Sequence, residues 1–430
     1  MRKNLNVIAA YTIMMGLIIL VGIFQSWNIA LSIFNLCLIS AVMTMGANIQ
    51  WGYAGLINFG IMGYTALGGL AAVLISVDPV QEAWSVGGSN ILLSLLLIIG
   101  IVLAVRYVLK KYEKSKVRTY IIATIIIAGI IIIRFVSEPG IEAIEEVDPA
   151  KTGFLGGFGL PIIFSWIVGA LFAGGLAFII GKVALGLRAD YLAIATLLIS
   201  EIVIAIIKHE DWLTRGVKNV IGLKRPAPYE VNLQQTDWFI NLVEKFNSSK
   251  LNLITDLTER QSALNQFVIE GSSIFVKLCY SALFLIVVII LLILTQKALY
   301  SPWGRMMRAI RDNEEAANAM GKNVVKQHLL IFVLGSAIVG IAGAMLVTQD
   351  GLFTPGSYRP MRYTFLIWVM VIVGGSGNNF GAILGGFVVW FLWIESAPIG
   401  LYLVNLTTAG LADTHFLKVH LIESVPYFRF

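Results

Sequence analysis

The chain has 430 residues, of which 58% are hydrophobic and 13% are charged, and its formal net charge at pH 7 is +6. Ordinary soluble domains are about 45–50% apolar, so the composition excludes a soluble protein. Nucleic acid is not an expected partner, because no basic run is interleaved with aromatic residues as single-strand binding requires. The two cysteines, Cys37 and Cys279, lie inside apolar runs and predict neither a disulfide framework nor a thiolate metal site.

Apolar stretches recur along the whole chain. A membrane helix needs about 20 mainly apolar residues, and eleven stretches meet this requirement: 5–24, 29–48, 53–77, 90–110, 119–136, 160–182, 190–207, 274–298, 327–348, 362–376 and 380–397. The first is longer than the apolar core of a signal peptide and no small-residue cleavage site follows it, so we interpret it as a retained span. The sequence predicts an all-α polytopic membrane protein with about 10–11 transmembrane helices.

The distribution of lysine and arginine predicts the orientation. If the N-terminus is cytoplasmic and every stretch spans, the inner connections lie near 49–52, 111–118, 183–189, 299–326 and 377–379. Positive residues gather at 106–118 and 297–326, as the positive-inside rule requires, whereas the outer connection 137–159 is acidic. The long connection 208–273 is predicted to be an extracytoplasmic loop, since loops of that length cross the membrane largely regardless of charge. We expect a plasma (inner) membrane protein.

Glycines punctuate two of the stretches. Small residues four apart let helices approach closely in lipid, so bundle packing is one interpretation. The other is that the helices are broken or re-entrant at Trp51–Gly63 and Gly374–Gly381 and line a path, because irregular backbone at membrane depth must be buried in protein or face water. On that interpretation the path candidates are Gly52, Gly55, Asn58, Gly375, Ser376 and Asn378.

Glu201 is an ionisable residue within the apolar run Leu198–Ala205. Such residues are functional candidates by default, which adds Glu201 to the candidates for the path. The alternatives are a structural ion pair with Lys208 or a position near the outer water layer.

The connection 299–326 is charged although apolar runs lie on both sides of it. Ser301-Pro302 predicts a helix start, and Arg305, Arg308 and Arg311 then share one face of a helix over Pro302–Arg311. A second helix is expected over Asn313–Met320, with an apolar edge of Ala316, Ala317 and Met320. It would be capped by Asp312, with Glu315 completing a capping box and Gly321 ending the helix.

Helices this short are marginal in water. The second one would therefore need a surface on which to dock, or else the segment is a solvated connector whose charges only enforce orientation.

At these residues the sequence resembles a known family. Glu315-Ala316-Ala317-x-x-x-Gly321 resembles the EAA loop by which permeases of ATP-binding-cassette (ABC) importers dock on their ATPases, and Ser301–Asn323 is similar to the form in M-type subunits of the branched-chain amino-acid permease family. Four further segments resemble that family in the same order: Trp51–Gly69, Gly186–Val203, Leu213–Pro226 and Val373–Gly386. The resemblance covers roughly 28–77, 160–226 and 274–397.

The resemblance implies an importer with two permease subunits, two cytoplasmic ATPases and an extracytoplasmic substrate-binding protein. Branched-chain amino acids are the first choice of substrate, and urea or a short amide is the alternative. It implies that Glu315, Ala316, Ala317 and Gly321 form a coupling helix. Arg305, Arg308, Arg311 and Asp312 complete the ATPase-coupling set, with lipid headgroups as an alternative partner of the arginines.

ATP and Mg²⁺ would bind the partner ATPases, because this chain has no phosphate-binding G-x-x-x-x-G-K-[ST] loop. We expect a transport subunit without catalytic residues, metal or cofactor of its own.

The sequence departs from the family pattern in several places, Asn58-Phe59 among them, and two competing classes of protein remain. Residues 79–159 add a helical hairpin and an outer loop, 227–270 lengthen the next outer loop, and the resemblance implies one more span beyond Phe430. An ATP-independent channel or secondary transporter would share the glycine-rich spans but would not need a docking helix. A membrane-embedded enzyme would need converging catalytic groups, and the four histidines show no metal-ligand spacing such as H-E-x-x-H.

Overall fold

Eleven helices correspond one to one to the eleven apolar stretches. The structure is a computed structural model that describes residues 2–148, 152–410 and 415–425. The eleven helices are α1 (Arg2–Phe24), α2 (Trp27–Asn48), α3 (Ile61–Ser76), α4 (Gln81–Lys111), α5 (Lys116–Glu146), α6 (Phe164–Ala184), α7 (Ala189–His209), α12 (Leu257–Tyr300), α15 (Val324–Asp350), α16 (Pro360–Gly374) and α17 (Asn379–Thr407). In the described part of the chain nine helices are long and apolar enough to cross a membrane, whereas α3 and α16 are shorter. The predicted all-α polytopic fold is confirmed.

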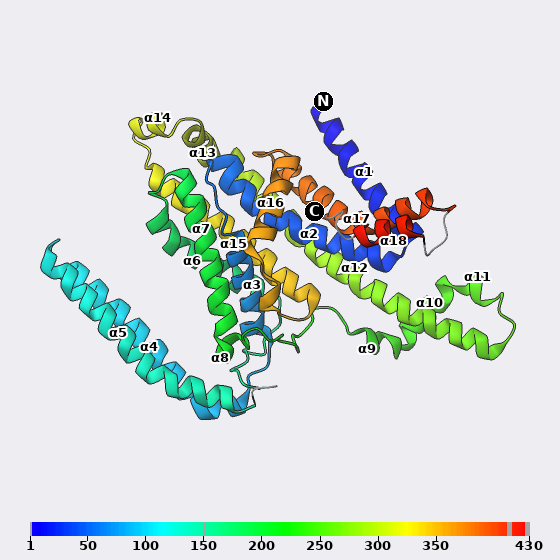
Figure 1. The fold of residues 1–430 in the computed structure, drawn as a ribbon, viewed down its shortest axis with the longest axis horizontal. Helices are drawn as coiled ribbons and strands as arrows, with labels where there is room; N and C mark the ends of the chain where they lie inside the picture. Colours follow the sequence, from blue (N-terminus) through cyan, green and yellow to red (C-terminus); the bar gives the residue numbers. More distant parts are fainter. Residues whose placement is uncertain (1, 149–151, 411–414, 426–430) are drawn as a thin grey trace.

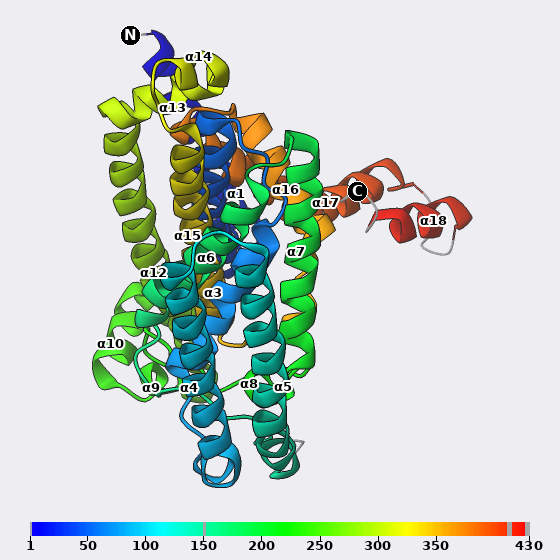
Figure 2. The ribbon, with the colours of Figure 1, turned by 90° about the vertical axis from the view of Figure 1, so that its left-hand side faces the viewer.

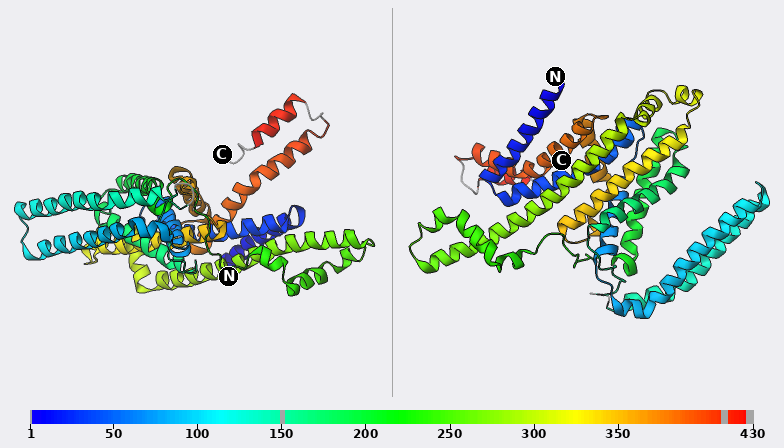
Figure 3. Two further views of the ribbon diagram at one scale, coloured as in Figure 1. Left: turned by 90° about the horizontal axis from the view of Figure 1, so that it is seen from below. Right: turned by 180° about the vertical axis from the view of Figure 1, so that it is seen from behind.

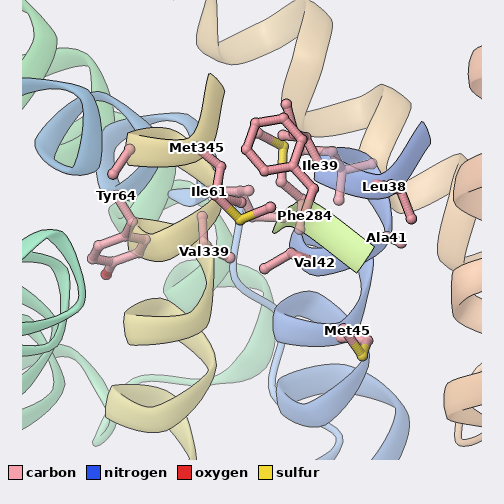
Figure 4. Close-up of a cluster of buried hydrophobic side chains, with 14 of the residues drawn as sticks. Leu38, Ile39, Ala41, Val42, Met45, Ile61, Tyr64, Phe284, Val339 and Met345 are labelled. Carbon is pink, nitrogen blue, oxygen red and sulfur yellow. The ribbon is translucent and has the colours of Figure 1, made fainter. Parts of the chain in front are cut away.

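Helices α2 and α15 form the centre of the bundle. α2 contacts α1, α12, α15, α16 and α17, while α15 also contacts α3 and α6. Figure 4 shows the apolar core where Leu38 and Val42 of α2 lie near Val339 and Met345 of α15. These side chains are buried from both solvent and lipid because helices surround them on all sides.

Glycines let three helices of this core approach closely. A Cβ on Gly68 of α3 would collide with the carbonyl of Gly340 on α15, and one on Gly340 would collide with the carbonyl of Gly169 on α6. Lipid supplies no hydrophobic driving force between helices, so such close contact is a principal source of their association. At these positions the packing interpretation of the glycines holds.

Helices α4 and α5 form a hairpin beside the bundle (Figure 1). Their contacts are chiefly with each other, and a small cluster of Ala83, Ile91, Ile144 and Leu155 joins the hairpin to the rest of the protein. In that cluster the indole N–H of Trp84 donates to the carbonyl of Leu155 at 3.0 Å. Most of the remaining apolar side chains of the hairpin are exposed. The predicted helical hairpin is present, with helices longer than the stretches 90–110 and 119–136.

The loop expected over 208–273 is shorter than the sequence suggested. It contains the short helices α8 (Asp211–Thr214), α9 (Glu230–Gln234), α10 (Asp237–Phe246) and α11 (Ser248–Leu251). It ends at Asp256, whose side chain accepts from the Thr258 backbone N–H at 2.8 Å and so caps α12. α12 begins well before the apolar run at 274 because its first turns pack on α9, α10 and α11.

Two short helices, α13 (Pro302–Asp312) and α14 (Glu314–Ala319), project from one end of the bundle, while α9 and α10 lie at the other (Figure 2). We call the first end the α13–α14 end. At the C-terminal side, α17 leads away from the bundle and α18 (Phe416–Ser424) packs on it (Figure 3).

Candidate functional site: two broken helices joined to the α13–α14 segment

The first break follows α2. A π-helical turn, η1 (Ile49–Tyr53), continues α2, and the backbone is then non-helical until α3 begins at Ile61. Gly55 has φ +73°, a left-handed conformation that favours glycine. The inner connection predicted at 49–52 is therefore wrong in its boundaries, since those residues stay helical and the break lies just after them.

The second break separates α16 from α17. The helix ends at Gly374, and Gly375 and Gly377 have φ of +89° and +79°. The Asn378 side chain then accepts from the Phe380 backbone N–H at 3.2 Å and caps α17. Breaks predicted at Trp51–Gly63 and Gly374–Gly381 are both present.

The two breaks meet each other. A Cβ on Gly52 would collide with the backbone nitrogen of Gly377, so only glycine fits at this contact. The side chain of Asn48 bridges the breaks, because its oxygen accepts from the Gly377 N–H at 2.8 Å and its amide donates to Asn379 at 2.9 Å. Asn379 in turn donates to Thr295 of α12 at 3.1 Å. Both asparagines are fully buried, so the loss of either leaves unsatisfied polar groups in the core.

A second set of buried polar groups fixes the first break. Gln50 donates to the carbonyl of Phe332 at 2.8 Å and to the hydroxyl of Ser336 at 3.0 Å, both on α15. Asn58 donates to the Gln50 side-chain oxygen at 2.8 Å and accepts from the Gly60 N–H at 2.8 Å. Asn58 is only 2% exposed, so in this conformation it holds the irregular backbone in place.

Helix α7 contributes two hydroxyl groups that sequence reasoning missed. Thr196 accepts from the Phe59 N–H at 3.0 Å, and Ser200 accepts from the Gly63 N–H at 2.8 Å. The neighbouring Glu201 is exposed on the helix, and the ion pairs of the described residues do not join it to Lys208. The small hydroxyl residues of α7, and not its carboxylate, contact the break.

Arg311 of α13 connects the contact between the two breaks, which we call the junction, to the charged segment 299–326. Its guanidinium donates to the carbonyl oxygen of Gly52 and to the carboxylate of Asp312, the latter at 3.1 Å. Its side chain also lies against the positions that a Cβ on Gly55 or Gly377 would occupy. Arg311 therefore touches both breaks at once.

The other two arginines of the predicted face are placed differently. Arg305 donates to the carbonyl of Tyr300 at 3.3 Å, and Arg308 to that of Leu299 at 3.5 Å, so both bond the end of α12. The buried side of α13 is formed by Met307 and Ile310. Among the three arginines, Arg311 alone is bonded to a broken helix within the described part of the chain.

Helix α14 starts one residue later than predicted. Asn313, and not Asp312, is the cap: its side-chain oxygen accepts from the Ala316 N–H at 2.9 Å. Asp312 remains in the last turn of α13, where it pairs with Arg311. The capping box of Asp312 with Glu315 is therefore wrong, because a cap bonds to the third helical residue and here that residue is Ala316.

The end of α14 agrees with the sequence pattern. Gly321 has φ +75°; its N–H donates to Asn318 at 2.9 Å, and the Lys322 N–H donates to Ala317 at 3.2 Å. These two bonds satisfy carbonyls that a helix end leaves free. Ala317 is buried, whereas Glu315, Ala316 and Met320 are exposed, so the expected apolar edge is only partly covered.

The remaining path candidates lie at the surface of the α13–α14 end. Gly375, Ser376 and Asn378 are exposed, next to the buried Asn379. No group of three His, Cys, Asp or Glu residues that could hold a metal ion occurs in the part of the chain that the structure describes.

These features define the class of protein. Discontinuous helices held together by buried polar side chains are a construction that helical membrane transporters use. The family model described as "Branched-chain amino acid transport system / permease component" matches residues 145–400, and the chain belongs to this family.

Three curated proteins show the extent of the similarity. The high-affinity branched-chain amino acid transport system permease protein LivM of Escherichia coli (strain K12) is 26% identical over 223 residues, which are 50% of this chain and 47% of that protein. The probable branched-chain amino acid transport permease protein LivM of Methanocaldococcus jannaschii is 34% identical over 90 residues, 21% of this chain and 26% of that protein. The LivH permease protein of E. coli (strain K12) is 27% identical over 119 residues, 28% of this chain and 38% of that protein.

The chain spans about half the length of the LivM proteins of E. coli and Salmonella typhimurium that it matches. No solved structure matches it.

Proposed function

We propose that this chain is a transmembrane permease subunit of an ABC importer that takes up branched-chain amino acids across the plasma (inner) membrane. Its partners would be two ATPase subunits on the cytoplasmic side, a second and homologous permease subunit, and an extracytoplasmic substrate-binding protein. ATP and Mg²⁺ would be bound by the ATPases. The N-terminus and the α13–α14 end would face the cytoplasm, in agreement with the basic residues at 297–326.

The observation that carries this proposal is the contact of Arg311 with Gly52. An ATPase that engages the exposed surface of α14, with Glu315 and Ala316, would move α13 as a rigid body. Arg311 would pass that displacement to η1, and through the Gly52–Gly377 contact to the second break. ATP-driven closure of the ATPases would then change how the two broken helices meet, which is where a path through the bundle would open.

Co-purification tests the coupling role. The chain carrying Glu315→Lys should lose its ATPase partners, whereas Glu113→Lys should retain them, because Glu113 is an equally exposed glutamate in the distant turn between α4 and α5. ATPases that remain bound to the Glu315→Lys chain, or a wild-type chain that recovers none, would favour an ATP-independent transporter.

Uptake identifies the substrate. Cells with and without the gene are compared for uptake of labelled leucine and of labelled urea. A leucine difference supports the proposal, a urea difference supports a urea or short-amide permease, and no difference in either refutes both substrate assignments.

A further inference from the structure

A cavity of about 230 Å³ lies between α2, α3, α15, α16 and α17. Its walls include Met43 of α2 and Met62 of α3, which flank the first break on either side, and Met370 of α16, which precedes the second. Its other end is marked by Asp350, the last residue of α15, and by Tyr358, which follows that helix at its end remote from α14. The cavity therefore lies between the two breaks and the end of the bundle opposite α13–α14.

Most of the cavity wall is aliphatic. Leu36 and Ile39 of α2, Leu346 of α15 and Ile367 of α16 face it from three helices. Pockets for drug-sized ligands usually measure about 300–1,000 Å³, so this one suits a solute of the size of a single amino acid. A branched aliphatic side chain would gain from burial against these walls, whereas urea has no apolar part to bury.

The polar groups of the wall include Asp350 and Trp390, neither of which has a hydrogen-bond or ion-pair partner among the described residues. Asp350 is exposed at the mouth, and no cation lies within ion-pair distance of its carboxylate. The indole N–H of Trp390 of α17 is buried and donates to nothing. A buried donor without an acceptor is costly, and a ligand that brings an anionic oxygen would satisfy it. Between them the two groups offer what an amino acid needs, a carboxylate for its ammonium group and a donor for its carboxylate.

The hydroxyl of Tyr358 is a further polar group of the cavity wall. Its side chain is 4% exposed, and burial, with a smaller effect of the Asp350 charge, raises the pKa of its hydroxyl above the ordinary value. Asp350 is the only carboxylate among the residues that line the cavity, and no lysine or arginine is among them. The mouth therefore favours a cationic group and the wall a neutral, branched one.

We propose that this cavity is a transit site for a zwitterionic amino acid with a branched aliphatic side chain. Asp350 receives the ammonium group, Trp390 donates to the carboxylate, and Leu36, Ile39, Leu346 and Ile367 surround the side chain. The inference rests on the proposed function for its substrate class, but it places the binding groups on this chain and not only on a separate binding protein.

Saturation-transfer NMR of leucine with the purified full chain in nanodiscs tests the site directly, without need of ATPases or uptake. We expect transfer to the methyl protons of leucine in the wild type and none to urea. Binding should weaken at least tenfold in Asp350→Asn, which removes the charge, and in Leu346→Trp, which fills the cavity. Trp390→Phe removes the N–H donor and keeps a smaller aromatic ring, so its thermal unfolding midpoint is measured beside binding, and a tenfold loss of binding at an unchanged midpoint is the expected result.

Asp237→Asn is the matched control, since Asp237 is an exposed aspartate at the start of α10, remote from the cavity, and should leave binding unchanged. 4-Methylpentanoate, which lacks the ammonium group, should bind weakly and be indifferent to Asp350→Asn. Leucine binding that is absent in the wild type, or unchanged in all three cavity variants, overturns the proposal. Failure of the proposed function would show separately, as loss of ATPase co-purification from the wild-type chain.

Discussion

Arg311 donates a hydrogen bond to the carbonyl oxygen of Gly52, a residue 259 positions earlier in the chain. The arginine belongs to a short helix outside the bundle, and the glycine belongs to a π-helical turn at the end of a buried helix. A main-chain carbonyl in an irregular turn is thereby satisfied from outside the turn, which ties the position of α13 to the shape of the break.

Substitution of Arg311 tests whether the position of α13 controls the shape of the first break. Hydrogen bonds to charged groups contribute about 1.5–3 kcal/mol, so Arg311→Ala should weaken the contact between α13 and the first break by about that much and lower leucine uptake. Binding of the ATPases should persist, because α14 is untouched. Arg134→Ala is the control, since Arg134 is an exposed arginine of α5 that pairs with Glu138. Equal effects of the two substitutions on uptake would argue against a special role for Arg311.

Gly52→Ala should destabilise the junction of the two breaks. The added methyl group would collide with the Asn48 side chain and the Gly377 backbone, and overpacking of this kind costs about 1–3 kcal/mol. Thermal unfolding in nanodiscs measures the effect as a lower midpoint. Gly100→Ala is the matched control, because nothing lies within 4 Å of the Cβ position of Gly100 on α4. A midpoint for Gly52→Ala equal to that of the control would mean that the contact is looser than described.

Gly321→Val and Gly321→Asn should differ in their effect although there is open space around the Cβ position of residue 321. At φ +75° a side chain with a branched Cβ is strained by roughly 1–2 kcal/mol, whereas asparagine visits this conformation routinely. Because α14 has only six residues, the valine variant should fray it and reduce recovery of ATPases with the chain. The asparagine variant should resemble the wild type, and recovery that is the same for both would contradict a role for the left-handed ending.

The number of long apolar helices could be predicted, because each membrane span needs a long apolar run and such a run is a local property of the sequence. The start of α12 could not, since residues 257–273 are mixed in composition and become helical through the Asp256 cap and contacts with α9 to α11. The cap was predicted to be Asp312, and the structure has Asn313 in its place. Both side chains can cap a helix, so the residue types alone could not identify the right one.

The residues that form the junction of the two breaks could be predicted only in part from the sequence. Glycine spacing pointed to both breaks, because only irregular backbone and close packing need so many glycines. Thr196 and Ser200 were missed, since a hydroxyl inside a helix can equally bond its own preceding turn. The Glu201 side chain is exposed on α7, and its place on a path stays a prediction.

The hairpin of α4 and α5 has a consequence for the outline of the protein in the bilayer. It is held mainly at the end remote from its own turn, by the cluster of Ala83, Ile91, Ile144 and Leu155, and the rest of its apolar surface is open. In a membrane this apolar surface needs acyl chains or the apolar face of a partner subunit against it. Where acyl chains cover it, the tilt of the hairpin is set by hydrocarbon thickness and, at Lys110, Lys111, Lys114 and Lys116, by the charge of the nearby headgroups, so the lipid composition helps to determine the shape of this protein.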